Sequence, residues 1–170
     1  MTSESDKLGD SHTISIFLPD EAATEALAQQ FAPLLCGGCP GGRIHLRGEL
    51  GTGKTSFARA LLRACGIRGR IKSPSYALIE SYNLSSLLLY HLDFYRFSDT
   101  LEWLDAGFRE ILQEDNVVLI EWPERAGEYL PAPDLDIQLE YATSGRHACL
   151  TAHTDRGKSW LKTIVFPAPR

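Results

Sequence analysis

The run Gly48-Glu49-Leu50-Gly51-Thr52-Gly53-Lys54-Thr55 is a complete G-x-x-x-x-G-K-S/T motif, the Walker A phosphate-binding loop. Such a loop surrounds nucleotide phosphates with backbone N–H groups, a lysine cation and the positive end of a helix, and its glycines allow the close approach. Lys54 is expected to reach the β- and γ-phosphates, and the Thr55 hydroxyl is expected to bind Mg²⁺. The motif therefore predicts a nucleotide-binding protein.

The residues on either side of the loop have the periodicity that this motif requires. Residues 43–47 alternate between polar and apolar side chains, as in a strand, and apolar side chains recur at helical spacing over residues 54–65. Gly66 then supplies a helix stop. A strand, a glycine loop and a helix in this order distinguish the motif from an ordinary glycine-rich turn.

The composition predicts one soluble domain. The chain has 170 residues, of which 44% are hydrophobic and 23% are charged. This is enough for one substantial core, whereas two independent domains would be cramped. Residues 1–11 are polar and contain no apolar stretch, so we expect a disordered tail, followed by a single P-loop ATPase domain over residues 12–170.

Hydropathy and charge argue against membrane and nucleic-acid-binding classes. The longest apolar runs are far shorter than the roughly 20 residues needed to cross a bilayer, so we expect no membrane segment and a cytoplasmic protein. The formal net charge of −5 disfavours broad, charge-driven binding of nucleic acid. Any connection with RNA is therefore expected to be indirect.

The remaining segments predict a mixture of strands and helices. A helix is expected to open at Asp20 and Glu21 and to end or kink at Pro33, and Asp99 is expected to cap a second helix over residues 100–112. Gly145 lies in a turn between two late strands that form a hairpin. Residues 158–166 have no clear pattern. Strands are predicted at residues 13–18, 43–47, 77–82, 87–94, 117–122, 136–141 and 147–152. This order predicts a three-layer α/β fold of the P-loop NTPase type with a mixed central sheet.

Two acidic residues end apolar strands, where open α/β sheets bind their ligands. Residues 117–120 are apolar and lead into Glu121, a Walker B pattern with Glu in place of the more usual Asp. Glu121 is therefore the candidate partner of Thr55 at Mg²⁺, and the alternative is an acid that merely ends a strand at the surface. Asp93 ends the segment that begins at Leu87, and its residues alone support a catalytic and a structural role about equally.

Three other features each allow two interpretations. The turn at residues 72–76 either senses the γ-phosphate or is a plain turn. Trp122 either packs in the core or forms a contact surface, and packing is favoured by the residues alone. Cys36 and Cys39 have C-x-x-C spacing, but no second pair completes a four-ligand zinc site, which favours a reduced pair in a glycine-rich turn.

The choice of nucleotide and of reaction follows from what the chain contains. It has no Asn-Lys-x-Asp run to read guanine, so adenine is the better prediction. A small-molecule kinase shares the loop but usually adds a mobile lid with several arginines, and no dense arginine lid is evident. A kinase and a non-catalytic, nucleotide-gated binding module stay open as alternatives to an ATPase.

Four motifs in order resemble the TsaE (YjeE) family of bacterial ATPases in tRNA threonylcarbamoyladenosine biosynthesis. They are residues 48–57, 72–76, 90–96 and 119–123. The departures are mild: Glu49 replaces a common Asp, Thr52 a common Ala, and Ser56 and Ser75 a common Thr. The likeness extends from residue 19 to about the hairpin at residues 145–146, and it says nothing about Cys36 and Cys39.

The resemblance implies an Mg²⁺-dependent ATPase that binds and regulates the TsaB–TsaD complex, which modifies tRNA at adenosine 37. It assigns the catalytic roles to Lys54, Asp93 and Glu121, and the Mg²⁺ contacts to Thr55 and Glu121. Trp122 becomes a candidate for coupling the site to partners. The nucleotide-binding residues that follow from the loop and the resemblance are Glu21, Thr24, Gly51, Thr52, Gly53, Lys54, Thr55, Ser56, Gly145 and Arg146.

Overall fold

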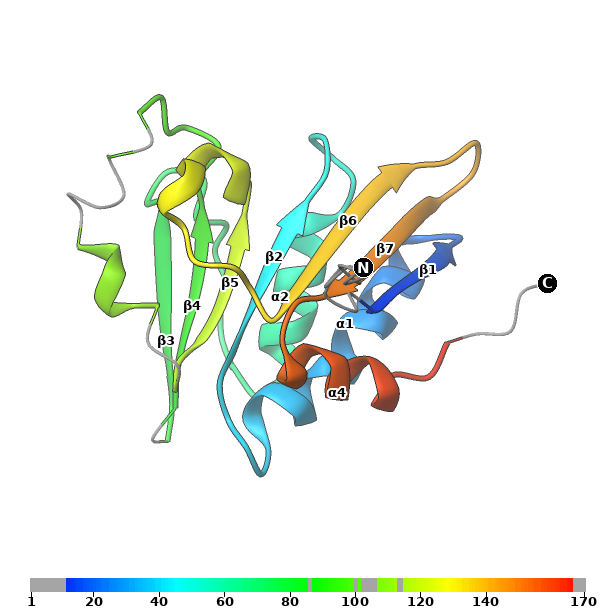
Figure 1. The fold of residues 1–170 in the computed structure, drawn as a ribbon, viewed down its shortest axis with the longest axis horizontal. Coiled ribbons are helices and arrows are strands. Elements are labelled where there is room, and N and C mark those ends of the chain that lie inside the picture. Colours follow the sequence, from blue (N-terminus) through cyan, green and yellow to red (C-terminus); the bar gives the residue numbers. More distant parts are fainter. Residues whose placement is uncertain (1–11, 86, 100, 102–106, 113–114, 167–170) are drawn as a thin grey trace, which may run out of the picture.

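The computed structural model describes residues 12–85, 87–99, 101, 107–112 and 115–166. Its strands form one sheet of seven in the order β1-β7-β6-β2-β5-β4-β3 (Figure 1). The strands are β1 (His12–Leu18), β2 (Gly42–Arg47), β3 (Ile79–Leu84), β4 (Leu87–Asp93), β5 (Val117–Glu121), β6 (Leu135–Tyr141) and β7 (Arg146–Ala152). The helices are α1 (Glu21–Cys36), α2 (Lys54–Ala64) and α4 (Asp155–Thr163), with the 3₁₀ segments η1 (Phe108–Glu110) and η2 (Pro123–Tyr129).

The sheet is mixed, as the sequence predicts. Strands β4, β5, β2 and β6 run parallel to one another, whereas β3 and β7 pair antiparallel with β4 and β6, and β1 pairs antiparallel with β7. The α/β fold with a mixed central sheet is therefore confirmed. Because the parallel strands all end at the same edge, the residues that follow β2, β4 and β5 meet there.

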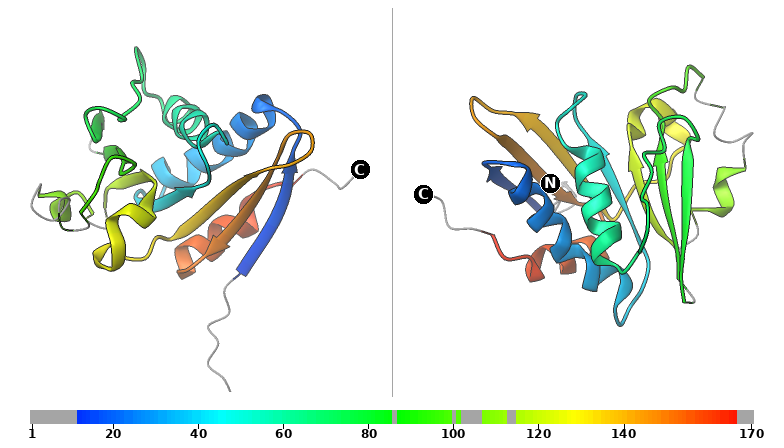
Figure 2. Two further views of the ribbon diagram at one scale, coloured as in Figure 1. Left: turned by 90° about the horizontal axis from the view of Figure 1, so that it is seen from above. Right: turned by 180° about the vertical axis from the view of Figure 1, so that it is seen from behind.

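Helices α1 and α2 lie side by side on one face of the sheet (Figure 2). The main core fills the space beneath them, with buried apolar side chains from both helices and from the strands. In α1, Leu27, Phe31 and Leu35 face this core at helical spacing, and Phe31 contacts Phe57 of α2 with ring centroids 6.0 Å apart. This packing fixes the N-terminus of α2, and hence the phosphate loop, relative to the strand ends.

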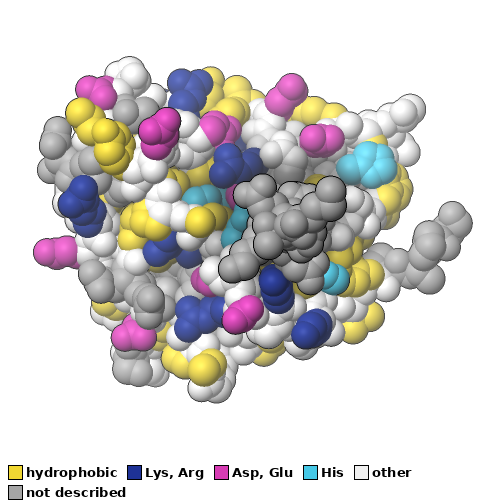
Figure 3. All heavy atoms as spheres, viewed as in Figure 1, with side chains coloured by type: hydrophobic (Ala, Val, Ile, Leu, Met, Phe, Trp, Pro, Cys, Tyr) yellow, Lys and Arg dark blue, Asp and Glu magenta, His cyan; other side chains and the backbone are white. Residues whose placement is uncertain are grey.

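Among the described residues, an apolar cover lies on the opposite face of the sheet over β4 and β5. There a second apolar cluster joins Leu92, Val118 and Ile120 to Phe94, Phe97, Phe108 and Ala126 from the connections and 3₁₀ segments. The same face over β2, β6 and β7 carries charged and polar side chains at alternating positions. Figure 3 shows side chains of both charges spread over the visible part of this side of the molecule. Among the described residues, no helix has both the length and the apolar content to cross a membrane.

Three segments differ from the sequence predictions. Helix α1 does not end at Pro33 but continues to Cys36, and Gln29, whose carbonyl loses its helical donor to Pro33, lies on an exposed turn that water can reach. Residues 155–163 form α4, capped by the Thr154 hydroxyl, which accepts from the Gly157 N–H at 3.1 Å. The predicted helix over residues 100–112 lies partly outside the described residues, and its end forms the 3₁₀ turn η1.

Candidate functional site

The phosphate loop joins β2 to the N-terminus of α2, as its motif predicts. Gly53 precedes α2 with a φ of 109°, a left-handed conformation that favours glycine. At Gly48, with a φ of 139°, a side chain would collide with the carbonyl oxygen of Leu139 in β6. These two glycines let the loop turn tightly against the sheet and present the first N–H groups of α2 toward the cavity.

Lys54 lies inside the curve of the loop and is buried. Its Nζ donates to the carbonyl oxygens of Gly48 and Glu49, at 2.6 and 2.7 Å, and lies 4.4 Å from the centroid of the Trp122 ring. Burial lowers the pKa of Lys54, while the nearby Glu121 carboxylate opposes that shift. The ammonium is thus held inside the phosphate loop, and its contact with a phosphate stays a prediction.

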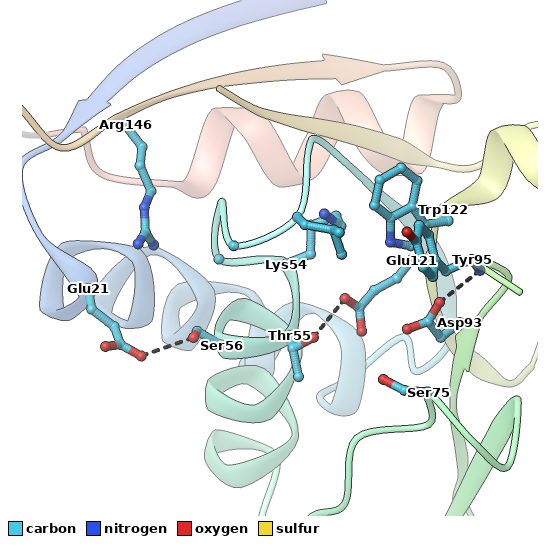
Figure 4. Close-up of a pocket in the computed structure, with 13 residues that line it drawn as sticks. Glu21, Lys54, Thr55, Ser56, Ser75, Asp93, Tyr95, Glu121, Trp122 and Arg146 are labelled. Carbon is cyan, nitrogen blue, oxygen red and sulfur yellow. Dashed lines mark hydrogen bonds between the residues drawn. The ribbon is translucent and has the colours of Figure 1, made fainter. Parts of the chain in front are cut away.

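Thr55 and Glu121 face each other across the cavity (Figure 4). The Thr55 hydroxyl donates to Oε1 of Glu121 at 2.8 Å, although the two residues are far apart in the sequence. Glu121 is buried, with 2% of its surface exposed, and it ends β5 next to Leu46 of β2. The alternative of an acid at the exposed end of a strand does not fit this burial.

Asp93 lies beside Glu121, because β4 and β5 are parallel and these two residues pair in register. Its Oδ1 accepts from the Tyr95 N–H at 2.9 Å. Burial raises the pKa of Asp93, the Tyr95 N–H lowers it, and the Glu121 carboxylate raises it further. A carboxyl with a raised pKa beside a second carboxylate is suited to accept a proton.

The other side of the cavity is formed by α1 and the β6–β7 hairpin. Glu21 accepts from the Ser56 hydroxyl at 2.9 Å, and Arg146 reaches toward them from the hairpin (Figure 4). The Nη1 atom of Arg146 lies against Gly53 and is buried without a hydrogen-bond partner among the described residues. A buried donor without a partner beside a phosphate loop suits an anionic ligand.

The structure brings most of the predicted residues into one cavity. Its walls are formed by Glu21, Leu50, Gly51, Gly53, Lys54, Thr55, Ser56, Ser75, Asp93, Tyr95, Glu121, Trp122 and Arg146. Thr24, Thr52 and Gly145 lie behind these walls. Thr24 is buried in α1, the Thr52 hydroxyl donates to the Glu49 carbonyl at 2.8 Å within the loop, and Gly145 forms the hairpin turn against Leu18 and Pro19.

Three residues at the site carry interactions that the sequence predictions missed. His91 of β4 bonds to Glu121, Nε2 to Oε2, at 2.7 Å. Tyr141 of β6 donates a short hydrogen bond to the Leu50 carbonyl at the tip of the phosphate loop. Trp122 adopts a left-handed backbone with a φ of 55°, and its ring contacts that of Tyr95 in a tilted arrangement with centroids 4.9 Å apart, so it both packs and lines the cavity. Of these three residues, only Trp122 is a candidate from the sequence. His91 lies within the motif at residues 90–96 but has no feature there that singles it out, and Tyr141 lies in none of the four motifs.

The donor atoms at the site fit Mg²⁺ and a nucleotide. Thr55 Oγ1 and Glu121 Oε1 are both hard oxygen ligands, and Mg²⁺ typically takes one or two protein oxygens together with phosphates and water. The described residues contain no cluster of three or more His, Cys, Asp or Glu that would hold a metal by themselves. All four cysteines are free thiols.

Known proteins share this fold and are related in sequence. A family model described as "Threonylcarbamoyl adenosine biosynthesis protein TsaE" matches residues 18–148. The crystal structure of YdiB from Bacillus subtilis aligns with a TM-score of 0.73 and 29% identity, covering 89% of this chain and 93% of that one. The P-loop NTPase-like fold is therefore shared with a solved relative.

Curated relatives carry the same family name. The tRNA threonylcarbamoyladenosine biosynthesis protein TsaE of Haemophilus influenzae is 34% identical over 160 residues, which cover 89% of this chain and 98% of the relative. The protein of that name from Bacillus subtilis is 38% identical over 103 residues, covering 61% and 64%. These matches confirm the resemblance seen in the four motifs, and the chain belongs to the TsaE family of tRNA threonylcarbamoyladenosine biosynthesis.

Proposed function

We propose that this protein is an Mg²⁺-dependent ATPase that binds and regulates the TsaB–TsaD complex during threonylcarbamoyladenosine modification of tRNA at adenosine 37. The observation that carries the proposal is the hydrogen bond between Thr55 of the Walker A loop and the buried Glu121 at the end of β5. It joins the two residues that a P-loop ATPase needs at its metal. Family membership supports the pathway, and a pathway that modifies tRNA supports a cytoplasmic location, with tRNA contacted only through the complex.

The residues of the cavity divide the work of hydrolysis among them. Lys54 and the N–H groups at the start of α2 bind the phosphates and offset their charge. Thr55 and Glu121 would hold Mg²⁺, which would neutralise charge on the phosphate oxygens. Asp93 orients the attacking water and accepts its proton, a role that suits a carboxyl whose pKa is raised by burial.

Apolar and aromatic side chains at the rim of the cavity support a protein partner. Leu50 is 61% exposed, Tyr76 is 83% exposed and Tyr95 is 40% exposed. Large aromatic groups left in water near a catalytic cavity are typical of protein contact sites. Trp122 lies between this rim and Lys54, since it contacts both Tyr95 and the Lys54 ammonium. Partner binding at the rim would therefore reach the phosphate site through Trp122.

The test is ATP turnover by the wild type and by Lys54→Ala and Glu121→Ala, each with and without purified TsaB and TsaD. We expect slow turnover by the wild type alone, stimulation by the partners, and loss of both in the two variants. Binding of a fluorescent ATP analogue without Mg²⁺ should weaken in Lys54→Ala but persist in Glu121→Ala. Full-rate hydrolysis that ignores TsaB and TsaD would contradict the regulatory part of the proposal.

A further inference from the structure

His91 is a buried histidine next to the proposed Mg²⁺ residues that has no role in the reaction outlined above. It lies in β4 on the same face of the sheet as Asp93, two residues earlier, and no part of its surface is exposed. Its Nε2 lies 2.7 Å from Oε2 of Glu121, a residue that is itself 2% exposed. Hydrogen bonds to charged groups in dry surroundings are among the stronger ones in proteins.

The two oxygens of Glu121 therefore have different partners. Oε2 faces His91, whereas Oε1 accepts from the Thr55 hydroxyl. A carboxylate held at both oxygens cannot rotate about its terminal bond without breaking a hydrogen bond. The His91 contact thus leaves Oε1, and not Oε2, next to the hydroxyl that is expected to bind Mg²⁺.

The two nitrogens of the His91 ring have different surroundings. Nδ1 of His91 is buried and has no hydrogen-bond partner within the described part of the chain. An ionised Glu121, the form that would bind a cation, only accepts hydrogen bonds, so in that form Nε2 of His91 is the donor of this bond. Burial of an unsatisfied Nδ1 is unfavourable, so within the described residues the favourable polar contact of this ring is the bond at Nε2.

We infer that His91 is a positioning residue, which holds Glu121 so that Oε1 is presented beside Thr55 as a ligand for the divalent cation. The inference rests on the proposed function, because it concerns the same cation. Groups that hold a metal ligand in this way typically change metal affinity or activity about 10- to 100-fold when they are replaced. His91 would not touch the nucleotide, so its removal should leave binding of ATP without metal unchanged.

Two substitutions of similar size separate the hydrogen bond from packing. His91→Gln keeps an N–H donor at about the reach of Nε2, and His91→Leu fills the space without a donor. His153→Leu is the matched control, because His153 also bonds to a carboxylate, Oδ2 of Asp136 at 2.8 Å, but lies on the polar face away from the cavity. Melting temperatures and circular dichroism show whether each variant folds.

The measurement is Mn²⁺ binding by electron paramagnetic resonance, with a non-hydrolysable ATP analogue bound. We expect His91→Leu to weaken Mn²⁺ binding about 10- to 100-fold and His91→Gln to recover most of the loss. His153→Leu should match the wild type, and binding of the analogue without metal should stay within about twofold in all variants. Unchanged Mn²⁺ affinity in His91→Leu, or an equal loss in His91→Gln, would overturn the inference.

A second measurement needs no variant of His91, so it can be made even if the His91 variants do not fold. In ¹⁵N-edited NMR of the ring nitrogens, we expect the proton on Nε2, and a shift of that signal when Glu121 is changed to Gln. A ring protonated on Nδ1 alone would exclude the bond to Glu121. If the wild type bound Mn²⁺ through His91-held Glu121 but did not hydrolyse ATP, the proposed function would fail while the inference stood.

Discussion

Ile120 of β5 and His45 of β2 are neighbours in register on the same face of the sheet, yet their surroundings differ. Ile120 belongs to the apolar cluster that covers this face over β4 and β5. His45 is followed across β6 and β7 by polar and charged side chains, and its Nδ1 lies 3.8 Å from Oδ1 of Asp136. We call β4 and β5 the covered strands, and β6 and β7 the open strands.

The difference follows the work that each part does. The covered strands carry Asp93 and Glu121 at their ends, and apolar packing on both faces holds those ends still. The open strands pair antiparallel with each other, and their alternating burial shows that they are packed on one face. They contribute the hairpin that carries Arg146, and the Tyr141 contact to the phosphate loop. Rigid packing is thus concentrated where charge must be positioned.

The largest expected effect tests the end of a covered strand. Asp93→Asn should lower ATP turnover about 10²- to 10⁴-fold, because the carboxyl that accepts a proton is lost while its shape is kept. Steady-state turnover and a fluorescent ATP analogue measure rate and binding separately, and binding should change little. Asp136→Asn on β6 is the matched control and should keep normal turnover. Equal losses in both variants would show that the two regions do not differ in function.

The second effect concerns stability. Ile120→Ala removes a fully buried side chain from the second cluster and should lower the free energy of unfolding by about 2–5 kcal/mol in urea titrations. Gln138→Ala, on the same face of β6, should stay within about 0.5 kcal/mol of the wild type. A small loss at Ile120 would mean that the cover over β4 and β5 adds little to the fold.

The third effect lies at the border between the two regions and depends on pH. Burial lowers the pKa of His45 from 6.5 to about 3, with Asp136 opposing the shift and Arg47, Arg43 and His153 adding to it. The unfolded chain therefore binds a proton that the folded chain does not, so stability present above pH 6.5 is lost as the pH falls toward 3.

His45→Gln removes this titration, and the slope of stability against pH in that window should decrease by up to about 1.4 kcal/mol per pH unit. Urea unfolding at a series of pH values measures the slope for both proteins. Parallel curves for the variant and the wild type would show that His45 does not contribute this pH dependence and is not a ring kept neutral by burial.

The smallest effect tests what an open strand adds to the site. Tyr141→Phe removes the hydrogen bond to the Leu50 carbonyl and should raise the dissociation constant for ATP about 2- to 10-fold, because one neutral hydrogen bond contributes about 0.5–1.5 kcal/mol. Isothermal titration calorimetry measures it. Tyr129→Phe, at an exposed tyrosine in η2, should have no effect. Normal affinity in Tyr141→Phe would confine the site to the covered strands and the loop.

Much of the structure around the phosphate loop and β5 could be predicted from the sequence. Three sequence patterns each reflect a local backbone requirement: the glycine spacing, the alternation of polar and apolar residues before it, and the apolar run into Glu121. The predicted bounds of the loop, β2, α2 and β5 are therefore close to the observed ones. The mixed sheet also followed, because hairpin signals are local. The two motifs also predict that Thr55 and Glu121 lie close together, and in the structure Thr55 Oγ1 and Glu121 Oε1 are 2.8 Å apart.

Contacts that depend on register and on layering could not be predicted. The pairing of His91 with Glu121 requires β4 and β5 to be adjacent and parallel in one register, for which no local pattern exists. Helix α1 continues past Pro33, where the residues alone predict an end or a kink, because the packing of Phe31 and Leu35 favours further helix. Helix α4 was missed because Gly157 interrupts its pattern, although Thr154 is an ordinary cap.

The position of Lys54 also bears on how ATP binds. Its ammonium is bonded to the carbonyl oxygens of Gly48 and Glu49, so the phosphates of a bound nucleotide would compete with these acceptors for its protons. Binding is then an exchange of partners around one cation, and the affinity reflects the difference between two sets of bonds. An Arg at position 54 would hold the carbonyls in a wider, planar geometry, which makes Lys the residue that can pass from one set of oxygens to the other.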